Sequence, residues 1–304
     1  MRPPFPRVID SSLMSSFRSC PRKFELEYLN HWKPHNQSVH LVAGGAYASG
    51  LEAARNAFYG QNRTPEESID IGREVLIRTY GNFQCPPDSA KSVERTAGAY
   101  DFYFSQYPLE ADAATPAVLA GGRLGIEFSF SEPLDILHPE TKDPLLYVGR
   151  LDMLCNFAGG LYGLDDKTTS QLGVSWPKQW DLRSQFTGYT WGAAKAGIPL
   201  DGFLIRGVSI LKTKYATMQS ITYRPEWAVD RWYRNLIRSL RVMIEMWEEG
   251  YFDYNLDHSC QDFGGCVFRQ VCLSQNPEPW LNSRFEQRVW DPVKRTEYLL
   301  KDIT

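Results

Sequence analysis

The sequence predicts an α/β protein: a mixed β-sheet core flanked by helices, with a helical region before the core and a cysteine-bearing segment after it. Three observations predict this class. Helical patterns fill the chain up to Pro108, strand-like apolar runs fill 123–223, and a long amphipathic pattern covers Trp227 to Glu249. In chain order, the expected parts are a helical region over 1–117, a core over 118–224 and a C-terminal part over 225–304, joined as one integrated unit.

The first part has the start and stop signals of several helices. Ser11 and Ser12 are good N-caps after a proline-rich, extended start, and Pro108 and Pro116 end the helical region. The expected helices run from Ser11 or Ser12 to about Asn30, from Gly44 to Tyr59, from Pro65 to Tyr80 and from Lys91 to Tyr107.

The middle part has the patterns of strands. Apolar residues alternate over Arg123–Phe130, and Gly159-Gly160 predicts a tight hairpin turn between two longer runs. The expected strands are Arg123–Phe130, Leu145–Phe157, Leu161–Thr168, Phe203–Lys212 and Met218–Tyr223, with helices over Pro177–Ala196 and Trp227–Glu249. Gly197 and Gly250 are expected to stop the two helices.

Composition and charge exclude several classes of protein. Hydrophobic residues make up 43% of the 304, which is typical of a globular chain and not of a disordered one. The net charge is −3, so nucleic-acid binding would need a local basic patch or a bound metal. The absence of a phosphate-loop lysine motif and of a His-Glu-x-x-His motif disfavours ATPase and metalloprotease chemistry.

No apolar run is as long as a membrane span, because Arg206 interrupts the most apolar stretch, Phe203–Leu211. Residues Met1–Asp10 lack the apolar stretch of a signal peptide. We therefore expect a cytoplasmic protein, of a bacterial cell or encoded by a phage. In that reducing compartment the six cysteines are expected to be metal ligands or buried thiols.

The hairpin places two carboxylates side by side. Asp152 lies on its first strand and Asp165 on its second, and two close carboxylates repel unless a cation lies between them. Mg²⁺ or Mn²⁺ suits an all-oxygen ligand set, to which Glu127 from the preceding strand is a further candidate. Lys167 follows Asp165 by two residues and therefore projects from the same face, where it can hold a water or a phosphate charge. This set suits phosphodiester hydrolysis.

A single Asp-x-Lys is short and common, and by itself it is expected to be an exposed strand end. Its combination with a Gly-x-x-Asp strand, the hairpin and a helix bearing Gln185 and Tyr189 is much rarer. Gln185 and Tyr189 are four apart and share one helical face, where they can contact a nucleic-acid strand, orient the lysine or pack on the sheet.

The order Glu127, Gly149-x-x-Asp152, Asp165-x-Lys167 and Gln185-x-x-x-Tyr189 resembles the PD-(D/E)xK nuclease superfamily in its RecB-like exonuclease branch. The resemblance implies a restriction-endonuclease-like fold and a Mg²⁺- or Mn²⁺-dependent deoxyribonuclease. It implies Asp152 and Asp165 as metal ligands, Lys167 as the catalytic lysine, Glu127 as a further acidic group, and the carbonyl of Asp166 as another ligand.

One position departs from that family. RecB-like nucleases carry a histidine in a pattern similar to Gly-x-x-x-His-x-x-Leu-Glu, and the frame Gly44–Glu52 has Ala48 at that place. A metal ligand of the family is therefore missing. The departure implies weaker metal affinity, an altered metal preference or an inactive relative. Because both aspartates and the lysine are present, we expect activity.

Three cysteines gather near the end of the chain, at positions 260, 266 and 272. Three thiols do not complete a four-ligand site, so a fourth ligand must come from elsewhere. Zinc is one alternative, although the Cys-x-x-Cys knuckles of structural zinc sites are absent. Three buried thiols are another. Cys85 and Cys155 have no partner in either scheme and are expected to be structural.

Cys20, in the segment Ser19–Phe24, resembles the first cluster cysteine of AddB-type and CRISPR-associated RecB-like nucleases. Those proteins hold a 4Fe–4S cluster on one cysteine before the nuclease core and three after it. The resemblance thus implies a 4Fe–4S cluster on Cys20, Cys260, Cys266 and Cys272, and it covers nearly the whole chain.

The helix after Trp227 has an apolar face and a basic one. The basic face carries Arg231, Arg234, Arg238 and Arg241, which form either a phosphate track or an ordinary solvated face. Arg18, Arg22 and Lys23 make a second basic cluster, and Tyr47, Trp176 and Trp180 are candidates for stacking on bases.

We expect a metal-dependent DNA exonuclease that acts on single-stranded ends. The alternatives are a catalytically inactive nuclease-like module that binds DNA or scaffolds a recombination complex, and an iron–sulfur redox or regulatory protein. Repair, recombination, phage replication and CRISPR adaptation all suit the resemblance. So do a homo-oligomer and recombination- or CRISPR-type protein partners.

Overall fold

The computed structural model describes residues 2–261, 265–291 and 296–299. The chain divides into two compact units. The first comprises Met1–Asn36, Ser131–Gly149 and Trp227–Thr304, and the second comprises Gln37–Phe130 and Arg150–Glu226. Each unit thus draws its residues from segments that are far apart in the sequence.

The main sheet has seven strands and is mixed. Its central path is β1 (Val8–Ile9), β5 (Pro144–Phe157), β6 (Gly160–Thr169), β7 (Gly202–Ile210) and β8 (Tyr215–Thr222), while β3 (Thr115–Pro116) and β4 (Ile126–Leu137) also pair with β5. Strands β6 and β7 are parallel, whereas β5–β6 and β7–β8 are antiparallel. With helices beside it, this sheet confirms the predicted α/β class.

The β5–β6 hairpin forms as the sequence predicts. Phe157 pairs with Gly160 across a two-residue turn in which Ala158 has φ 49° and Gly159 has φ 83°. Positive φ at both central residues gives the type of turn whose twist matches that of the flanking strands. The turn fixes the register, because the pairs continue from there to Met153 opposite Leu164.

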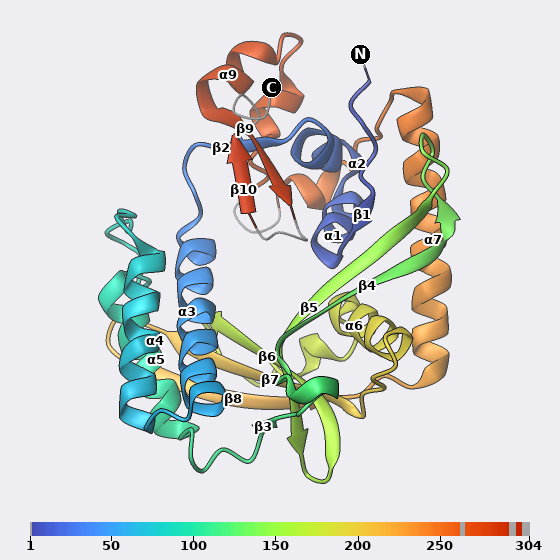
Figure 1. The fold of residues 1–304 in the computed structure, drawn as a ribbon. Helices are drawn as coiled ribbons and strands as arrows, with labels where there is room; N and C mark the ends of the chain where they lie inside the picture. The colour runs from blue at the N-terminus through green and yellow to red at the C-terminus, as the bar shows by residue number, and fades with distance from the viewer. Residues whose placement is uncertain (1, 262–264, 292–295, 300–304) are drawn as a thin grey trace. The chain divides into compact units, whose positions relative to one another are not determined.

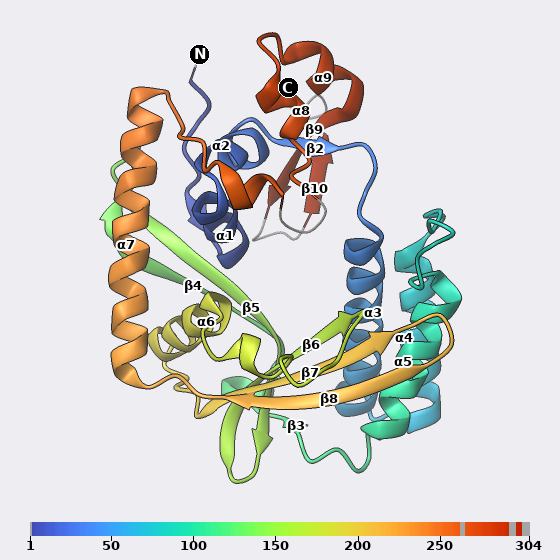
Figure 2. The same cartoon turned by 180° about the vertical axis from the view of Figure 1, so that it is seen from behind.

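Three helices of the second unit pack together beside the sheet: α3 (Val39–Arg55), α4 (Pro65–Tyr80) and α5 (Val93–Gln106). Figure 2 shows them side by side, with β6, β7 and β8 lying next to one another. Their buried faces share one apolar cluster that includes Tyr47, Leu76 and Tyr100 and reaches Val208 and Ile210 of β7. This cluster holds α3 against the strand pair that carries the acids.

The parallel strand β7 is buried along its whole length, as is usual for a strand covered on both faces. A parallel neighbour requires a crossover, which here is α6 (Ser184–Lys195). Phe186 and Tyr189 of α6 contact Phe203 of β7. The helix that carries the predicted Gln/Tyr pair therefore packs directly on the sheet.

The first unit has its own elements. They are α1 (Ser11–Ser19), α2 (Pro21–Phe24), α7 (Glu226–Glu249), α8 (Arg269–Leu273), α9 (Glu278–Arg284), β2 (Trp32–Pro34), β9 (Phe285–Asp291) and β10 (Thr296–Leu299). Strands β10, β9 and β2 form a three-stranded antiparallel sheet (Figure 1). The apolar face predicted for α7 is buried, and its residues are Trp232, Leu236, Leu240, Met243 and Trp247.

Several helix boundaries differ from the prediction, three of them by four residues or more. The expected helix from Ser11 to Asn30 breaks at Cys20, which is extended at φ −163° because the residue before a proline avoids the helical region. α3 begins at Val39, five residues before the predicted Gly44. The predicted Pro177–Ala196 helix begins only at Ser184, after a short 3₁₀ turn over Lys178–Trp180. The bounds predicted for α4 are confirmed.

The helices within the described residues include none that is both apolar and long enough to cross a membrane.

The contact between α3 and α4 is close enough to test. A Cβ added to Gly72 would lie 2.5 Å from the carbonyl oxygen of Gly50 and 2.1 Å from the hydroxyl of Tyr100. Because neither neighbour can move without disturbing the cluster, we expect Gly72→Ala to lower the free energy of unfolding by about 1–3 kcal/mol. Urea denaturation measures this.

Gly45→Ala is the matched control, because a Cβ at Gly45 of α3 meets nothing within 4 Å. Replacing glycine in an open helix position stabilises by up to about 1 kcal/mol. The two variants should therefore shift stability in opposite directions. Equal stabilities would contradict the close packing of α3 on α4.

Candidate active site

Asp152 and Asp165 lie where β5 and β6 separate. The ladder between the strands ends at Met153 opposite Leu164, so these acids occupy the next positions on each strand. The backbone N–H of Asp166 donates to Oδ2 of Asp152 at 2.8 Å, and the Asp165 charge acts on Asp152. The structure thus brings together the two carboxylates that the sequence predicts to be neighbours.

Lys167 projects from the same face of β6 as Asp165, as the two-residue period requires. Its Nζ contacts Oδ1 of Asp165, which is only 3% exposed. Opposite it on the neighbouring strand is Gly207 of β7. The ammonium therefore neutralises one of the two central acids while remaining partly open to solvent.

Glu127 joins these acids from β4. It has φ 53°, a rare value for a residue other than glycine, and Nε of Arg150 lies 2.6 Å from its Oε2. The charges of Glu52 and Asp165 act on Glu127, and the charge of Arg150 acts on Glu52. Glu127, Arg150 and Glu52 are therefore neighbours at the edge of the aspartate pair.

Asp166 faces the opposite side of β6, toward α3. Its Oδ2 lies 2.7 Å from NH2 of Arg55, and the two side chains are 1% and 5% exposed. Arg55 also donates to the Tyr103 hydroxyl at 2.7 Å. The Asp166 side chain is thus part of a buried ion pair behind the aspartate pair, and only its backbone faces Asp152.

A second buried arginine continues this network. Arg206 of β7 is paired with Asp166 in the sheet register and donates to both oxygens of Asp112, at 2.6 and 2.7 Å. It also donates to the Tyr103 hydroxyl at 3.0 Å. Tyr103 therefore accepts from the two arginines and connects the two ion pairs.

Burial raises the pKa of every acid at the front of the site. The pKa of Glu127 is raised to about 7 by burial, against the lowering effect of Arg150. The pKa of Asp152 is raised to about 8 by burial and by the charge of Asp165. Burial also raises the pKa of Asp165, against the lowering effect of Lys167. These carboxyls therefore hold protons more tightly than free ones do.

Gln185 and Tyr189 share one face of α6, and Nε2 of the glutamine donates to the tyrosine hydroxyl at 2.9 Å. Tyr189 is buried, with its ring against Phe130 and Phe203. Its ring therefore packs on the sheet, while its hydroxyl is held by a partly exposed amide. The pair meets as the sequence predicts, and the packing role is the one the contacts show.

Sequence reasoning missed three arginines of this site. Arg55 and Arg150 pair with Asp166 and Glu127, and Arg183, just before α6, lowers the pKa of Asp165 through its charge. A signal for Arg55 exists in the sequence: it lies seven residues after Ala48 and three after Glu52, on the same helical face. The face of α3 that carries Ala48 and Glu52 thus brings an arginine to Asp166.

Four cysteines of the first unit influence one another. The charges of Cys20, Cys260 and Cys266 all raise the pKa of Cys272, which burial brings to about 11. The N–H of Cys266 donates to the carbonyl of Cys260 at 3.1 Å. Cys155, by contrast, is fully buried in the second unit, and burial raises its pKa to about 12. Cys85 contacts the carbonyl of Pro86.

The predicted basic face of α7 is exposed. Arg231, Arg234, Arg238 and Arg241 all point away from the buried side of the helix. Arg22 instead pairs with Glu25, and Arg18 donates to Ser239. Tyr47, Trp176 and Trp180, the candidates for stacking on bases, are all buried, and Trp176 lies against Gly207, so these three are core residues.

Comparison with known proteins identifies the fold around these acids. The sequence model of the PD-(D/E)XK nuclease superfamily matches residues 11–273. The chain belongs to this superfamily. The match includes Asp152, Asp165 and Lys167, and also Cys20, Cys260, Cys266 and Cys272.

One solved structure agrees with this fold. A protein from Eubacterium rectale described as a "putative exonuclease" aligns with a TM-score of 0.50 at 14% identity, over 89% of this chain and 94% of that one. A second structure, that of SSO0001, aligns with a TM-score of 0.33 at 12% identity, over 86% of this chain and 96% of that one, and carries no argument. No protein of curated function matches the chain.

Members of this superfamily generally use divalent metals, and the donor set of this chain fits one. Asp152, Asp165 and Glu127 offer carboxylate oxygen atoms, the ligand type that Mg²⁺ and Mn²⁺ prefer, and the positive charge of Lys167 on Oδ1 of Asp165 marks where a cation is needed. Across all the residues that the structure describes, no three His, Cys, Asp or Glu side chains are arranged to hold a metal ion. Each acid instead has a cation or a backbone N–H as its partner.

The raised pKa values predict how the metal-free protein responds to pH. Because folded Glu127 keeps its proton up to about pH 7, its contribution to stability is present at acid pH and is lost as the pH rises toward 8. For this carboxyl alone the loss is on the order of 3 kcal/mol. Urea denaturation in EDTA across this range measures it.

Glu127→Gln should remove the part of that dependence that Glu127 contributes, since the amide does not titrate, and the raised pKa of Asp152 should leave the rest. Glu74→Gln removes an exposed glutamate of α4 and should keep the wild-type profile. A wild-type stability that rises from pH 5 to pH 8 in EDTA would contradict the protonated state of the buried acids.

Proposed function

We propose that this protein is a Mg²⁺- or Mn²⁺-dependent DNA exonuclease that hydrolyses phosphodiester bonds at single-stranded ends. One observation carries the proposal: Asp152 and Asp165 meet where β5 and β6 separate, with Lys167 beside them. Two buried carboxylates and a lysine on adjacent strands suit metal-assisted hydrolysis of a phosphate diester.

Each residue then has a defined task. Asp152, Asp165, Glu127 and the carbonyl of Asp166 would hold the metal, which when bound supplies an activated water and neutralises charge on the phosphate. Lys167 exchanges its contact with Asp165 for the phosphate oxygen or the water. The Asp166 side chain does not enter this step, because Arg55 holds it on the far side of β6.

Other residues would guide the strand. Gln185 is partly exposed beside the Tyr189 hydroxyl and can donate to a phosphate or a base edge. The exposed arginines of α7 are suited to bind the backbone of DNA. The description of the Eubacterium rectale protein supports an exonuclease in preference to an endonuclease.

We test the nuclease proposal with end-labelled single-stranded DNA and Mn²⁺ or Mg²⁺. Asp165→Asn and Lys167→Met should each slow cleavage by at least about a hundredfold, because each removes a charge that the transition state needs. Asp143→Asn removes an exposed acid of a surface pair and is the control expected to cleave like the wild type.

Two further substrates sharpen that assay. Circular single-stranded DNA should resist the wild type, and duplex DNA should be cut more slowly than single strands. Cleavage of the circle would replace the exonuclease with an endonuclease. Failure of the wild type to cut any substrate with any divalent metal would contradict the whole proposal.

A specific observation favours an inactive, DNA-binding or scaffold module as the second candidate. Ala48 stands at the family's histidine position, and the cations Lys167, Arg150 and Arg55 already pair with Asp165, Glu127 and Asp166. The acids are therefore stable without a metal. The cleavage assay with divalent metals separates this candidate from the enzyme.

We further propose that Cys20, Cys260, Cys266 and Cys272 hold a 4Fe–4S cluster, as in the RecB-like branch. The charges of the other three cysteines act on Cys272, which supports their being neighbours, and the positive charges of Arg22 and Lys23 nearby suit an anionic cluster, although burial leaves the pKa values of Cys266 and Cys272 raised. Such a cluster would connect two distant parts of the chain, and by analogy with a long-loop crosslink would stabilise by on the order of 5 kcal/mol.

Protein purified without oxygen should be brown and should contain iron and sulfide. Cys266→Ser should lose the colour and the iron because it removes a thiolate ligand, and it should unfold at lower urea. Cys85→Ser, which alters a cysteine of the second unit, should keep both. Colourless wild-type protein with stoichiometric zinc would exclude the cluster. Absorption spectra and metal analysis decide the outcome.

A further inference from the structure

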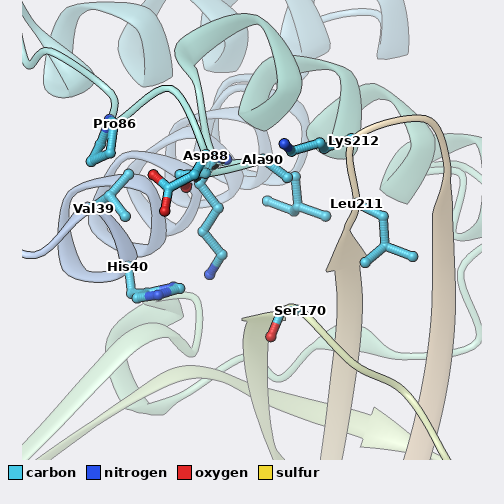
Figure 3. Close-up of a pocket in the computed structure, with 11 residues that line it drawn as sticks. Val39, His40, Pro86, Asp88, Ala90, Ser170, Leu211 and Lys212 are labelled. Atoms are coloured by element: carbon cyan, nitrogen blue, oxygen red, sulfur yellow. Dashed lines mark hydrogen bonds between the residues drawn. The ribbon is translucent and has the colours of Figure 1, made fainter. Parts of the chain in front are cut away.

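A cavity of about 540 Å³ lies on the α3 side of the second unit, at the ends of β6 and β7. Figure 3 shows His40 from the first turn of α3, Asp88 from the loop before α5, and Ser170 after β6 around one hollow, with Leu211 and Lys212 from the β7–β8 loop beside it. Lys91 also lines it. None of these residues has a task in the proposed hydrolysis.

Lys91 is the unusual member of this lining. It is only 4% exposed, and its Nζ donates to Oγ1 of Thr168 at 3.2 Å. Its backbone is fixed, because the Tyr80 hydroxyl donates to its carbonyl at 2.6 Å and its N–H donates to the Ser89 hydroxyl at 3.2 Å. Within the described residues no carboxylate pairs with it.

An ammonium has three N–H donors, so a buried one that donates to a single neutral hydroxyl has two donors that still need acceptors. Burial lowers the pKa of Lys91, which reflects the cost of its missing counter-charge. An anion in the cavity would supply both the charge and the acceptors. The cavity is therefore better matched to a negative ligand than to a neutral one.

The start of α3 adds donors to the same cavity. Val39 and His40 line it and are the first two residues of this 17-residue helix. The N-cap Ser38 makes no side-chain hydrogen bond to the helix. The N–H groups of the first helical turn have no acceptor within the helix, and the helix dipole adds positive potential there. Lys91 and the first turn of α3 thus both favour a negatively charged ligand in the cavity.

The remaining polar groups are consistent with an anion. Lys212 is exposed at the rim, and Ser89 and Ser170 offer hydroxyls. Burial and the charge of Lys91 lower the pKa of His40, so its ring is a neutral donor at pH 7. Asp88 opposes an anion, but it is exposed, and water screens its charge more than that of the buried lysine.

The cavity is coupled to the aspartate pair through β6. Thr168, whose hydroxyl accepts the hydrogen bond from Lys91, follows Lys167 directly and lies three residues from Asp165. Three residues of strand span about 10 Å. The Thr168 side chain lies on the α3 face of β6, as Asp166 does, so a nucleic-acid strand with its scissile bond at Asp165 would reach Lys91 by passing around the end of β6, which ends at Thr169.

We propose that this cavity, built by Lys91, Lys212 and the first turn of α3, binds a phosphate group of the DNA strand and so holds that strand a few nucleotides from the scissile bond. This inference rests on the proposed function. The phosphate is either a terminal monoester or an internal diester, which share the same chemistry. Lys91 is accordingly a binding residue and not a catalytic one.

The test measures binding of a fluorescent single-stranded oligonucleotide by anisotropy in EDTA, so that no cleavage occurs. Lys91→Met should weaken binding by roughly tenfold, because a charge-assisted hydrogen bond is lost. It should also lower the slope of log affinity against log salt by about one, since one phosphate contact is removed. Lys91→Arg should restore most of both.

Lys195→Met is the matched control, an exposed lysine at the end of α6. It should leave the affinity close to wild type. Lys212→Met changes an exposed rim residue and should weaken binding in the same direction as Lys91→Met, so the proposal remains testable if Lys91→Met does not fold. Urea denaturation of every variant separates lost binding from lost structure.

Two oligonucleotide series distinguish the two phosphate sources. If the terminal monoester is bound, removing the 5′- or 3′-phosphate weakens wild-type binding and leaves Lys91→Met unchanged. If an internal diester is bound, replacing one phosphate with a neutral methylphosphonate weakens wild-type binding at one fixed position of the oligonucleotide and leaves Lys91→Met binding unchanged. Either pattern supports the site.

Folded Lys91→Met and Lys212→Met proteins with wild-type affinity and salt slope would overturn the proposal. That result is separate from the cleavage assay. If the protein binds DNA through Lys91 but never cleaves it, the phosphate site stands and the nuclease proposal fails. If the protein cleaves DNA and both variants bind like the wild type, the nuclease proposal stands and the phosphate site fails.

Discussion

The structure depends on how it neutralises a group of acids buried at one point of a sheet. Asp152, Asp165 and Glu127 meet where β5 and β6 separate, and their mutual repulsion would open the hairpin if nothing opposed it. The chain opposes it with Lys167, Arg150 and a backbone N–H. The remaining cost appears as raised pKa values, so the acids hold protons that a metal would displace.

A second layer of charge lies behind the first and fixes α3 to the sheet. Arg55 pairs with Asp166, Arg206 pairs with Asp112, and Tyr103 accepts from both arginines. Breaking one partner of a buried pair costs about 3–5 kcal/mol, because the other charge is left without compensation. The network therefore fixes where α3 packs against β6. It thereby also fixes the position of Glu52 beside Arg150.

Much of the site was predictable because strand and hairpin geometry are local. The two-residue period puts Asp165 and Lys167 on one face, and the Gly159 turn sets the register that makes Asp152 and Asp165 neighbours. Gln185 and Tyr189 contact each other because residues four apart lie on one face of a helix, which is also a local rule. Arg55 and Arg183 were missed because they reach the acids across elements whose packing no local period encodes.

Sequence alone determined the α/β class, the hairpin, α4 and the acids that face each other across two adjacent strands. Tertiary structure decided which charges accompany the acids, because Arg55, Arg150 and Arg183 come from three different segments. It decided that Trp176 and Trp180 are core residues. It also enclosed Lys91 without a carboxylate partner among the described residues, since burial depends on distant segments that the sequence does not order in space.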